Sequence, residues 1–322
     1  MFYPIIFFTG FLASLALLFF FQQYALNFKL LNKKGIPSVG GVAMGLSFLV
    51  LFSLFFPTGG FLAKETFGIV AGAALVLVAG IIDDLIELSV PAKFLFQLAA
   101  TALLMCFGVR THIVYIGDVG NIIITLLWVI GITNALNHLD VLDGLAAGAA
   151  VISNLAFFSV ALLNGDVSSA LLSLLLMAVT LPFLLYNLPP ARMYMGNSGS
   201  HFLGFLMAAC AIVISYAPLD RKVALLTPLF VLGLPVFDTA FLIFVRLRQG
   251  RSAFKKSDDH MALRYLKQGY SKRKVLLFIL LLGLFSAVAA VIGSQVPNFA
   301  GIVIFAFAGF VFLLVGIRMN RV

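Results

Sequence analysis

The sequence predicts an all-α integral membrane protein that crosses the bilayer about eleven times. Of its 322 residues, 62% are hydrophobic and only 10% are charged, and the mean hydropathy is +1.14. These values exclude an ordinary soluble globular protein. Apolar runs recur along the whole chain, each near the ~20 residues that a helix needs to cross a bilayer.

The expected spans are joined by short connections, so residues 1–322 are predicted to form a single multi-span domain. The first span lacks a positively charged start and is interpreted as a retained helix rather than a signal peptide. Cys106 and Cys210 fall inside spans, which argues against a disulfide framework or a zinc site. Polar residues interrupt the fifth and ninth spans, at Asn134 and Asn137 and at Asp238. The spans are expected at 3–21, 39–56, 66–82, 92–109, 122–137, 145–163, 169–186, 202–218, 223–243, 275–293 and 299–317.

Basic residues predict the orientation, with the N-terminus outside and the C-terminus in the cytoplasm. This arrangement places 17 of the 21 lysines and arginines on the cytoplasmic side and leaves Lys64, Arg110, Arg221 and Lys222 outside. Cytoplasmic loops of membrane proteins carry such an excess. The net charge of +9 is therefore explained by topology and by anionic membrane lipids, without a nucleic-acid partner.

Five cytoplasmic loops are expected to form an active site: 22–38, 83–91, 138–144, 187–201 and 244–274. Acidic residues are costly near lipid and mark functional sites there. Asp83 and Asp84 are adjacent carboxylates, whose mutual repulsion favours a nearby cation. Mg²⁺ prefers a few carboxylates together with phosphate oxygens, and a solvated acidic helix end is the alternative.

The segment 133–148, TNALNHLDVLDGLAAG, is the most specific stretch. Asn134, Asn137, Asp140 and Asp143 are spaced by three residues, so a helix would place them along one slowly drifting stripe. Four polar groups in an apolar context indicate a binding site or the lining of an aqueous cavity.

The remaining loops carry weaker signals. Lys33 and Lys34 can hold a phosphate, or they simply follow the excess of basic residues in cytoplasmic loops. Residues 196–200 are expected to form a loop leading into a helix, where backbone amides suit anions. Asp258, Asp259 and His260 precede MALRYLKQ, which is predicted to form an amphipathic helix against the membrane.

In this order and on these loops, GIIDDLIELS, TNALNHLDVLDGLAAG, YNLPPARMYMGNSGSHFLGF and DHMALRYLKQGYS resemble the polyprenyl-phosphate N-acetylhexosamine-1-phosphate transferase superfamily, with KKGIPSVGG closest to its lipid I branch. The resemblance covers nearly the whole chain. It implies transfer of a sugar-1-phosphate, N-acetylglucosamine-1-phosphate above all, from a UDP-sugar to undecaprenyl phosphate with release of UMP. It also implies Mg²⁺ (or Mn²⁺) as cofactor, a bacterial plasma membrane location with a cytoplasmic active site, and a homodimer.

The same resemblance implies roles for individual residues. The catalytic residues would be Asp83, Asp84, Asp140, Asp143 and His260. The substrate-binding residues would be Lys33, Lys34, Asn134, Asn137, Asn187, Tyr194 and Arg264, with Tyr194 stacking on the uracil. The metal ligands would be Asp84, Asp143 and Asn197.

Several positions depart from the family pattern. Asn197 stands where relatives have an aspartate, Val141 replaces a glycine, and Ser38 replaces an arginine. His260 alone remains of an H-x-H-H motif, because Ala262 and Leu263 take the other two places. These departures motivate a second hypothesis, a non-catalytic homologue that binds lipid phosphate or a partner enzyme. A transporter is a third, weaker reading: it predicts acids near mid-bilayer and inverted repeats, whereas these acids lie at helix ends.

Overall fold

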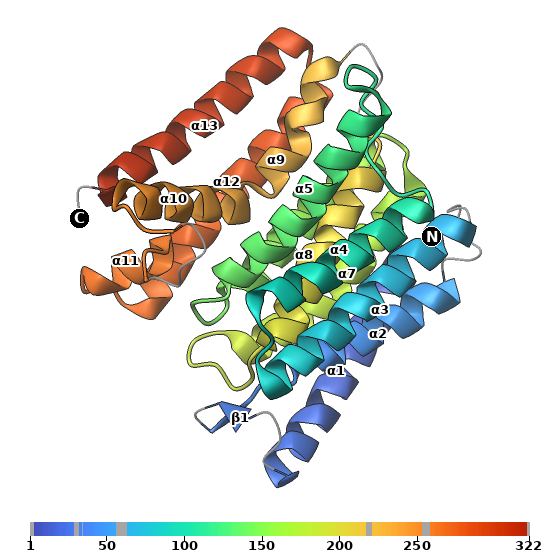
Figure 1. The fold of residues 1–322 in the computed structure, drawn as a ribbon, viewed down its shortest axis with the longest axis vertical. Helices are drawn as coiled ribbons and strands as arrows, with labels where there is room; N and C mark the ends of the chain where they lie inside the picture. The colour runs from blue at the N-terminus through green and yellow to red at the C-terminus, as the bar shows by residue number, and fades with distance from the viewer. Residues whose placement is uncertain are drawn as a thin grey trace.

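In the part of the chain that the structure describes, the fold is helical apart from one short hairpin, which confirms the predicted class. It is known from a computed structural model that describes residues 3–28, 32–33, 35–55, 63–216, 221–252 and 258–320. Within these ranges the elements are α1 (Tyr3–Phe28), β1 (Asn32–Lys33), β2 (Ile36–Pro37), α2 (Gly40–Phe55), α3 (Ala63–Ile86), α4 (Val90–Cys106), α5 (Gly117–Leu139), α6 (Leu145–Leu163), α7 (Val167–Asn187), α8 (Gly196–Val213), the 3₁₀ helix η2 (Lys222–Leu226), α9 (Thr227–Val231), α10 (Gly233–Arg248), α11 (Met261–Lys267), α12 (Lys272–Gln295) and α13 (Asn298–Asn320) (Figure 1).

Helix length supports a multi-span membrane protein. Within the described residues, eight helices are long and apolar enough to cross a bilayer, and a bent pair, Lys222–Val231 with Gly233–Arg248, adds a ninth candidate. Two further apolar helices, α2 and α4, are shorter than this test requires. Each of the eleven expected spans therefore coincides with an apolar helix or helix pair, while the number that cross the membrane stays a prediction.

The ninth expected span is broken. The axes on either side of Leu232 differ by 75°, and Pro228 and Gly233 flank the break, as residues that interrupt helices do. The carbonyl oxygens of Phe230 and Val231 accept hydrogen bonds of 2.6 and 2.8 Å from the hydroxyls of Ser286 and Ser153. Neighbouring helices thus satisfy the backbone groups that the break leaves open, as a low-dielectric setting requires.

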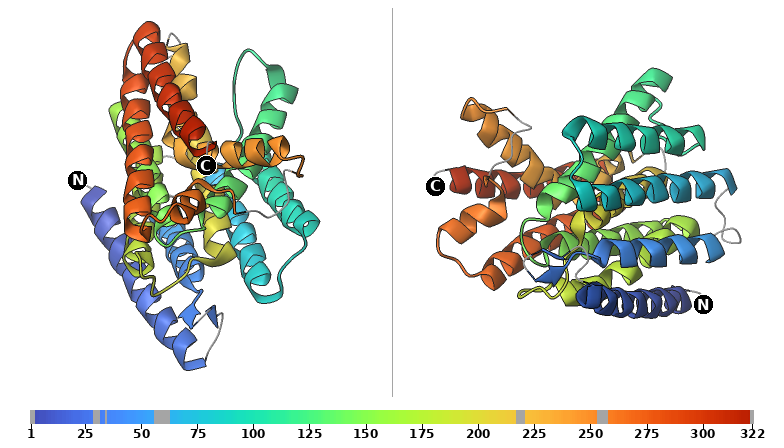
Figure 2. Two further views of the ribbon diagram at one scale, coloured as in Figure 1. Left: turned by 90° about the vertical axis from the view of Figure 1, so that its left-hand side faces the viewer. Right: turned by 60° about the horizontal axis from the view of Figure 1, so that its bottom comes forward.

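Helix α8 lies at the centre of the molecule. It packs against α2, α3 and α5, and 78% of its most apolar stretch is buried, against 22% for α1 and for α13. Helices α10 to α13 form one side of the molecule and α1 to α4 the other, as Figure 1 and the right-hand view of Figure 2 show. The core is thus built around α8, while the outermost helices turn apolar surface outward.

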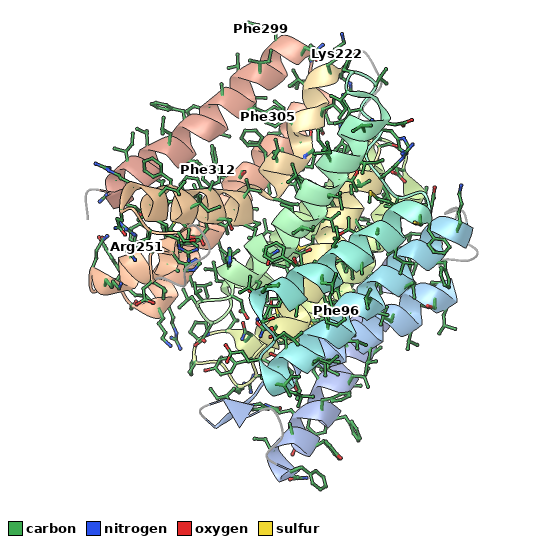
Figure 3. The ribbon with its side chains drawn as sticks, viewed as in Figure 1. Phe96, Lys222, Arg251, Phe299, Phe305 and Phe312 are labelled. Carbon is green, nitrogen blue, oxygen red and sulfur yellow. The ribbon has the colours of Figure 1, made fainter. Side chains whose placement is uncertain are left out.

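The outer helix α13 shows how that surface divides. Phe305 stacks on Phe230 with ring centroids 4.6 Å apart, and Phe312 meets Phe237 at 4.8 Å. Phe299, in contrast, is 80% exposed, and large side chains project outward along the helix in Figure 3. A helix that is apolar on all sides is typical of a segment in contact with lipid.

Candidate active site

Two adjacent cavities lie where the expected cytoplasmic loops converge. The smaller one, here the polar cavity, has a volume of 460 Å³, and the second, here the large cavity, 910 Å³. Asn137 and Val141 line both of them, so the two share a wall. The polar cavity is lined by Ser38, Asn137, Asp140, Val141, Leu142, Asp143, Asn187, Tyr194, Gly196, Asn197 and Lys272.

Asp84 caps the N-terminal end of α8. Its Oδ1 accepts a hydrogen bond of 2.8 Å from the Asn197 N–H, and its Oδ2 accepts bonds of 3.0 and 2.9 Å from the N–H and the hydroxyl of Ser198. A carboxylate at a helix N-terminus satisfies free amides and complements the helix dipole. The helix begins at Gly196 (φ 73°) and not after a loop over 196–200. Two of the amides predicted to bind an anion are thus occupied by Asp84.

Asp83 points to a different partner from Asp84, because adjacent helical residues face different directions. Its side chain is almost completely buried, with Oδ2 2.7 Å from Lys93 Nζ. Its Oδ1 accepts a hydrogen bond of 2.7 Å from the Leu88 N–H. The repulsion expected between the adjacent acids is therefore relieved by Lys93 on one side and by the amides of α8 on the other.

The polar stripe of the sequence divides at the end of α5. The helix ends at Leu139, so only Asn134 and Asn137 lie on it. Asn134 exchanges hydrogen bonds of 2.7 and 3.3 Å with the Gln97 side chain of α4. Asn137 donates bonds of 3.1 and 2.8 Å to Asn197 Oδ1 and Ser200 Oγ of α8. Asp140 and Asp143 follow in the turn, and so the single helical stripe that the spacing predicts is wrong for these two residues.

That turn brings the two acids to the polar cavity. Gly144 has a φ of 81°, a left-handed conformation that glycine adopts without strain. Its N–H donates a 2.8 Å hydrogen bond to the Asn187 side chain, whose own amide donates to the Met193 carbonyl at 2.8 Å. Asn187 thus ties two loops together at the cavity wall. Lys272 Nζ lies 3.5 Å from Asp143 Oδ2.

Tyr194 is fixed through its backbone. Its N–H donates to the Pro37 carbonyl at 2.9 Å, and its own carbonyl accepts from the Gly40 N–H at 3.1 Å. The loop before α8 is thereby held to the end of the β1–β2 hairpin, and the half-buried Tyr194 lines the polar cavity. Tyr194 therefore lies at the polar cavity, and its stacking on the uracil stays a prediction.

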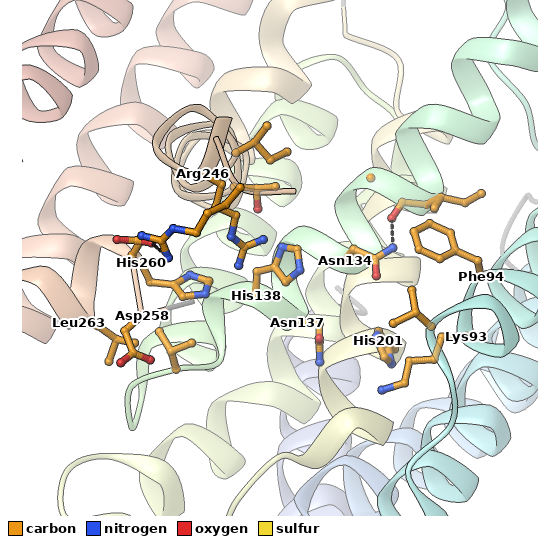
Figure 4. A pocket seen from close by; sticks show the side chains of 18 of the residues that line it. Lys93, Phe94, Asn134, Asn137, His138, His201, Arg246, Asp258, His260 and Leu263 are labelled. Atoms are coloured by element: carbon orange, nitrogen blue, oxygen red, sulfur yellow. Dashed lines mark hydrogen bonds and ion pairs between the residues drawn. The ribbon is translucent and has the colours of Figure 1, made fainter. Parts of the chain in front are cut away.

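The large cavity has mainly apolar walls with basic groups among them (Figure 4). Val90, Phe94, Ile130, Ile243 and Leu263 supply apolar surface. The titratable residues that line it are Lys93, His138, His201, Arg246, Arg251, Asp258, Asp259, His260 and Lys267. Such a cavity suits a ligand with an apolar body and an anionic end.

Among the predicted substrate-binding residues whose side chains the structure describes, Arg264 is the one that lines neither cavity. Arg264 donates 3.0 Å hydrogen bonds to Asp259 and to the Met319 carbonyl, and its guanidinium lies over the Phe241 ring. These contacts join α11 to α13. Only the backbone of Lys33, on β1, is described, and Lys34 lies outside the described residues.

Comparison with known proteins gives the family. Residues 66–215 match the model described as glycosyl transferase family 4. The probable undecaprenyl-phosphate N-acetylglucosaminyl 1-phosphate transferase of Bacillus subtilis (strain 168) is 33% identical over 272 residues, which are 81% of this chain and 74% of that protein. The chain belongs to glycosyl transferase family 4.

Other members of family 4 are similar over comparable lengths. The decaprenyl-phosphate N-acetylglucosaminephosphotransferase of Mycobacterium tuberculosis (strain ATCC 25618 / H37Rv) is 35% identical, with 76% of this chain and 69% of that protein covered. The undecaprenyl-phosphate alpha-N-acetylglucosaminyl 1-phosphate transferase of Escherichia coli (strain K12) is 24% identical, with 89% and 81% covered. The family match includes the acids of the polar cavity but ends before His260.

The residues of this family 4 chain offer Mg²⁺ part of a coordination sphere. Asp140, Asp143 and Asn197 line one cavity, and their oxygens are of the type that Mg²⁺ prefers. Among the described residues no group of three or more His, Cys, Asp or Glu forms a complete metal site. The donor set therefore fits a cation that also takes oxygens from a phosphate ligand, which is common for Mg²⁺. Asp84, also predicted as a ligand, does not line this cavity.

The cavity residues that escaped prediction as site residues include Lys93, His138, Arg246 and Lys272. Lys93 had a usable signal, because it is the one charged residue in the expected span 92–109. His138 sits between Asn137 and Asp140 in the most specific segment. Arg246 and Lys272 belong to the basic loop and its flank, where the positive-inside rule already explains them.

Proposed function

We propose that this protein transfers N-acetylglucosamine-1-phosphate from UDP-N-acetylglucosamine to a polyprenyl phosphate, undecaprenyl phosphate above all. A phosphate oxygen of the lipid attacks the β-phosphorus of the donor. The bond from that phosphorus to the oxygen bridging it to the α-phosphorus breaks, and UMP leaves. Membership of the family and the names of the relatives support this reaction. The paired cavities are the structural observation that carries it, because they suit two substrates of opposite character.

The polar cavity suits the nucleotide donor. Tyr194 offers a ring for the uracil, and Lys272 offers a positive charge beside Asp143. The large cavity suits the lipid, because most of its wall surface is apolar and the basic side chains of Lys93, Arg246 and His260 line it as candidate partners of the lipid phosphate. Asn137 and Val141 lie between the two. The phosphate of the lipid and the diphosphate of the donor would meet at this shared wall. Such positioning supplies much of the rate enhancement in phosphoryl transfer.

Asp140, Asp143 and Asn197 would hold Mg²⁺ together with phosphate oxygens of the donor. When bound, the metal would neutralise negative charge that develops on the transferred group. The side chains of the protein have separate tasks. Asn137 holds the Asn197 side chain in place through its 3.1 Å hydrogen bond, and Lys93 adds positive charge next to Asp83. The reaction would take place at the cytoplasmic face of a bacterial plasma membrane. The excess of basic residues in these loops supports this location, because cytoplasmic loops carry such an excess.

Release of UMP by the purified protein tests this function. The assay contains undecaprenyl phosphate, UDP-N-acetylglucosamine and Mg²⁺ in detergent. Asp140→Asn is the inactive control, because it keeps the side-chain volume and removes a charge that faces the polar cavity. Asp84→Ala is a poor control, because Asp84 also holds the start of α8. Release that requires lipid, metal and Asp140 is expected.

A non-catalytic homologue is the second candidate, and Asn197 is the observation that favours it. Its neutral oxygen offers Mg²⁺ less than a carboxylate would. Folded protein that releases no UMP with any of a panel of UDP-sugars would favour this candidate. Activity with a different donor would instead keep the reaction class and change the sugar.

A further inference from the structure

Asp238 and His260 form a buried pair beside the large cavity. Asp238 lies on α10, and His260 immediately precedes α11. Asp238 Oδ2 lies 2.9 Å from His260 Nδ1, and Oδ1 accepts a 2.8 Å hydrogen bond from the Met261 N–H. The side chains are 2% and 8% exposed. A buried carboxylate needs such partners, and both oxygens of Asp238 have one.

The pair defines which nitrogen of His260 is available. An ionised carboxylate only accepts hydrogen bonds, so beside an ionised Asp238 a neutral His260 ring would carry its proton on Nδ1 and donate it to Asp238. Nε2 then carries a lone pair and is the nitrogen left for a ligand in the large cavity, which His260 lines. The hydrogen bond that one ring nitrogen makes thus sets the chemistry of the other.

The groups around His260 favour an anionic ligand. His138, at the end of α5, faces it with ring centroids 6.1 Å apart, and Arg246 of α10 lines the same cavity (Figure 4). Lys93 of α4 lines it as well, and its Nζ also pairs with Asp83 Oδ2 at 2.7 Å. The nearby acids are engaged with bases: Asp259 lies 3.4 Å from Arg251 and 3.0 Å from Arg264, and Asp258 lies 3.7 Å from Lys267. Basic side chains in such an apolar cavity suit a phosphate group.

We propose that Asp238 is a positioning residue, which directs Nε2 of His260 toward a phosphate in the large cavity. The inference rests on the proposed function, in which that phosphate belongs to the lipid acceptor. Nε2 takes the proton of the phosphate monoanion, and a phosphate dianion and an imidazolium result. The proton moves from the P–OH oxygen to Nε2, and no other bond changes. The Asp238 carboxylate stabilises the imidazolium, and the dianion is the stronger nucleophile toward the donor.

Asp238 also anchors the start of α11 through the Met261 N–H, so its replacement must keep that contact. Asp238→Asn does so, because the carboxamide oxygen can still accept this bond while its NH₂ group faces Nδ1. A donor in that position is compatible only with an unprotonated Nδ1. The proton of the neutral ring then resides on Nε2, and the lone pair is lost from the cavity.

Kinetics of UMP release give the first test. Asp238→Asn is expected to lower kcat on the order of 100-fold, as loss of general acid–base catalysis does, with KM for both substrates nearly unchanged. Asp118→Asn removes the same charge from an exposed residue that pairs with Arg110 and is expected to keep the wild-type kcat. Wild-type kcat in Asp238→Asn would overturn the proposal.

The double variant separates positioning from a general structural effect. If Asp238 acts through His260, adding Asp238→Asn to His260→Asn lowers kcat no further, because residues that act as a unit are not additive. Losses that multiply instead would show that Asp238 acts independently of His260, which contradicts the proposal.

Nitrogen NMR of histidine-labelled protein gives a test that needs no substrate. The chain has four histidines, and the signal that disappears in His260→Asn assigns His260. At mildly alkaline pH the wild-type ring is expected to carry its proton on Nδ1, and the ring in Asp238→Asn on Nε2. A wild-type proton on Nε2 would overturn the proposal whether or not the protein releases UMP. If both proteins show the expected tautomers but the wild-type protein releases no UMP in any assay, the result would instead count against the proposed function.

Discussion

At the scale of single residues, Asn197 is the weakest member of the proposed Mg²⁺ site, because its side chain is neutral. Its Oδ1 accepts a hydrogen bond from Asn137, and its N–H donates to Asp84. The site is therefore ordered around a neutral side chain. In the proposed site, Mg²⁺ affinity would therefore depend on the charges of Asp140, Asp143 and the substrate phosphates.

Asn197→Asp is expected to lower the Mg²⁺ concentration for half-maximal UMP release by roughly 10-fold. The added charge would lie next to the cation, where even about 1.4 kcal/mol of extra attraction has this effect. A magnesium titration measures it. Asn298→Asp is the matched control at the start of α13, where the Asn298 side chain accepts from the Val223 N–H and an aspartate can do the same. Loss of turnover in well-folded Asn197→Asp would show instead that the neutral side chain is integral to the chemistry.

Asp84 and Asp143 are both predicted catalytic acids, but the structure gives them different surroundings. Asp84→Ala removes three hydrogen bonds at the start of α8 and is expected to cost about 1–2 kcal/mol of stability, as loss of a helix cap does. Asp143→Ala removes one long contact with an exposed lysine and is expected to abolish UMP release with little change in stability, because exposed ion pairs contribute little. Thermal unfolding in detergent compares the two. Equal unfolding midpoints would contradict the capping role of Asp84.

At the scale of elements, α8 is held between α2 and α3 by close backbone approach. A Cβ at Gly41 would overlap the backbone of Gly199, and one at Gly80 would overlap the backbone of Ser198. Small residues allow helices in membranes to approach in this way. The start of α8, and with it Asn197, is positioned by these two contacts.

Gly41→Ala and Gly80→Ala are therefore expected to lower the unfolding temperature and to reduce UMP release, because overpacking costs about 1–3 kcal/mol. Gly309→Ala on α13 is the control, since a Cβ there would meet nothing within 4 Å. Thermal unfolding and turnover are measured on the same preparations. Unchanged unfolding in both test variants would show that α8 can shift to admit the methyl groups.

The sequence predicts the helical elements better than the contacts between them. Apolar runs place the helices, because a membrane span needs a long apolar stretch. The pairing of Asp238 with His260 depends on the 75° bend between α9 and α10, and periodicity carries no signal for such a bend. Likewise, the adjacency of Asp83 and Asp84 suggests a shared role, while their separate partners come from α4 and α8, which only the fold brings near.

At the scale of the whole molecule, the proposed reaction requires the chain to present its basic loops to the compartment that supplies the nucleotide. Asp140 and Asp143 lie between α5 and α6, Asn197 lies at the start of α8 and Lys272 at the start of α12, yet all four line one cavity. These helix ends therefore lie on one face of the bundle. The orientation of that face is still a prediction from the basic residues, and the homodimer is still an implication of the family resemblance.

Labelling of single cysteines by a membrane-impermeant maleimide tests the orientation. The exposed Cys106 is first replaced by alanine. The other cysteine, Cys210, is buried and should stay unreactive. Intact spheroplasts are expected to label Asp118→Cys, which the predicted topology places outside, but Ser271→Cys only after lysis. Both positions are exposed, so accessibility to the reagent differs only through the membrane. Labelling of Ser271→Cys in intact cells would place the polar cavity outside, away from a cytoplasmic nucleotide donor, and would contradict both the topology and the proposed reaction.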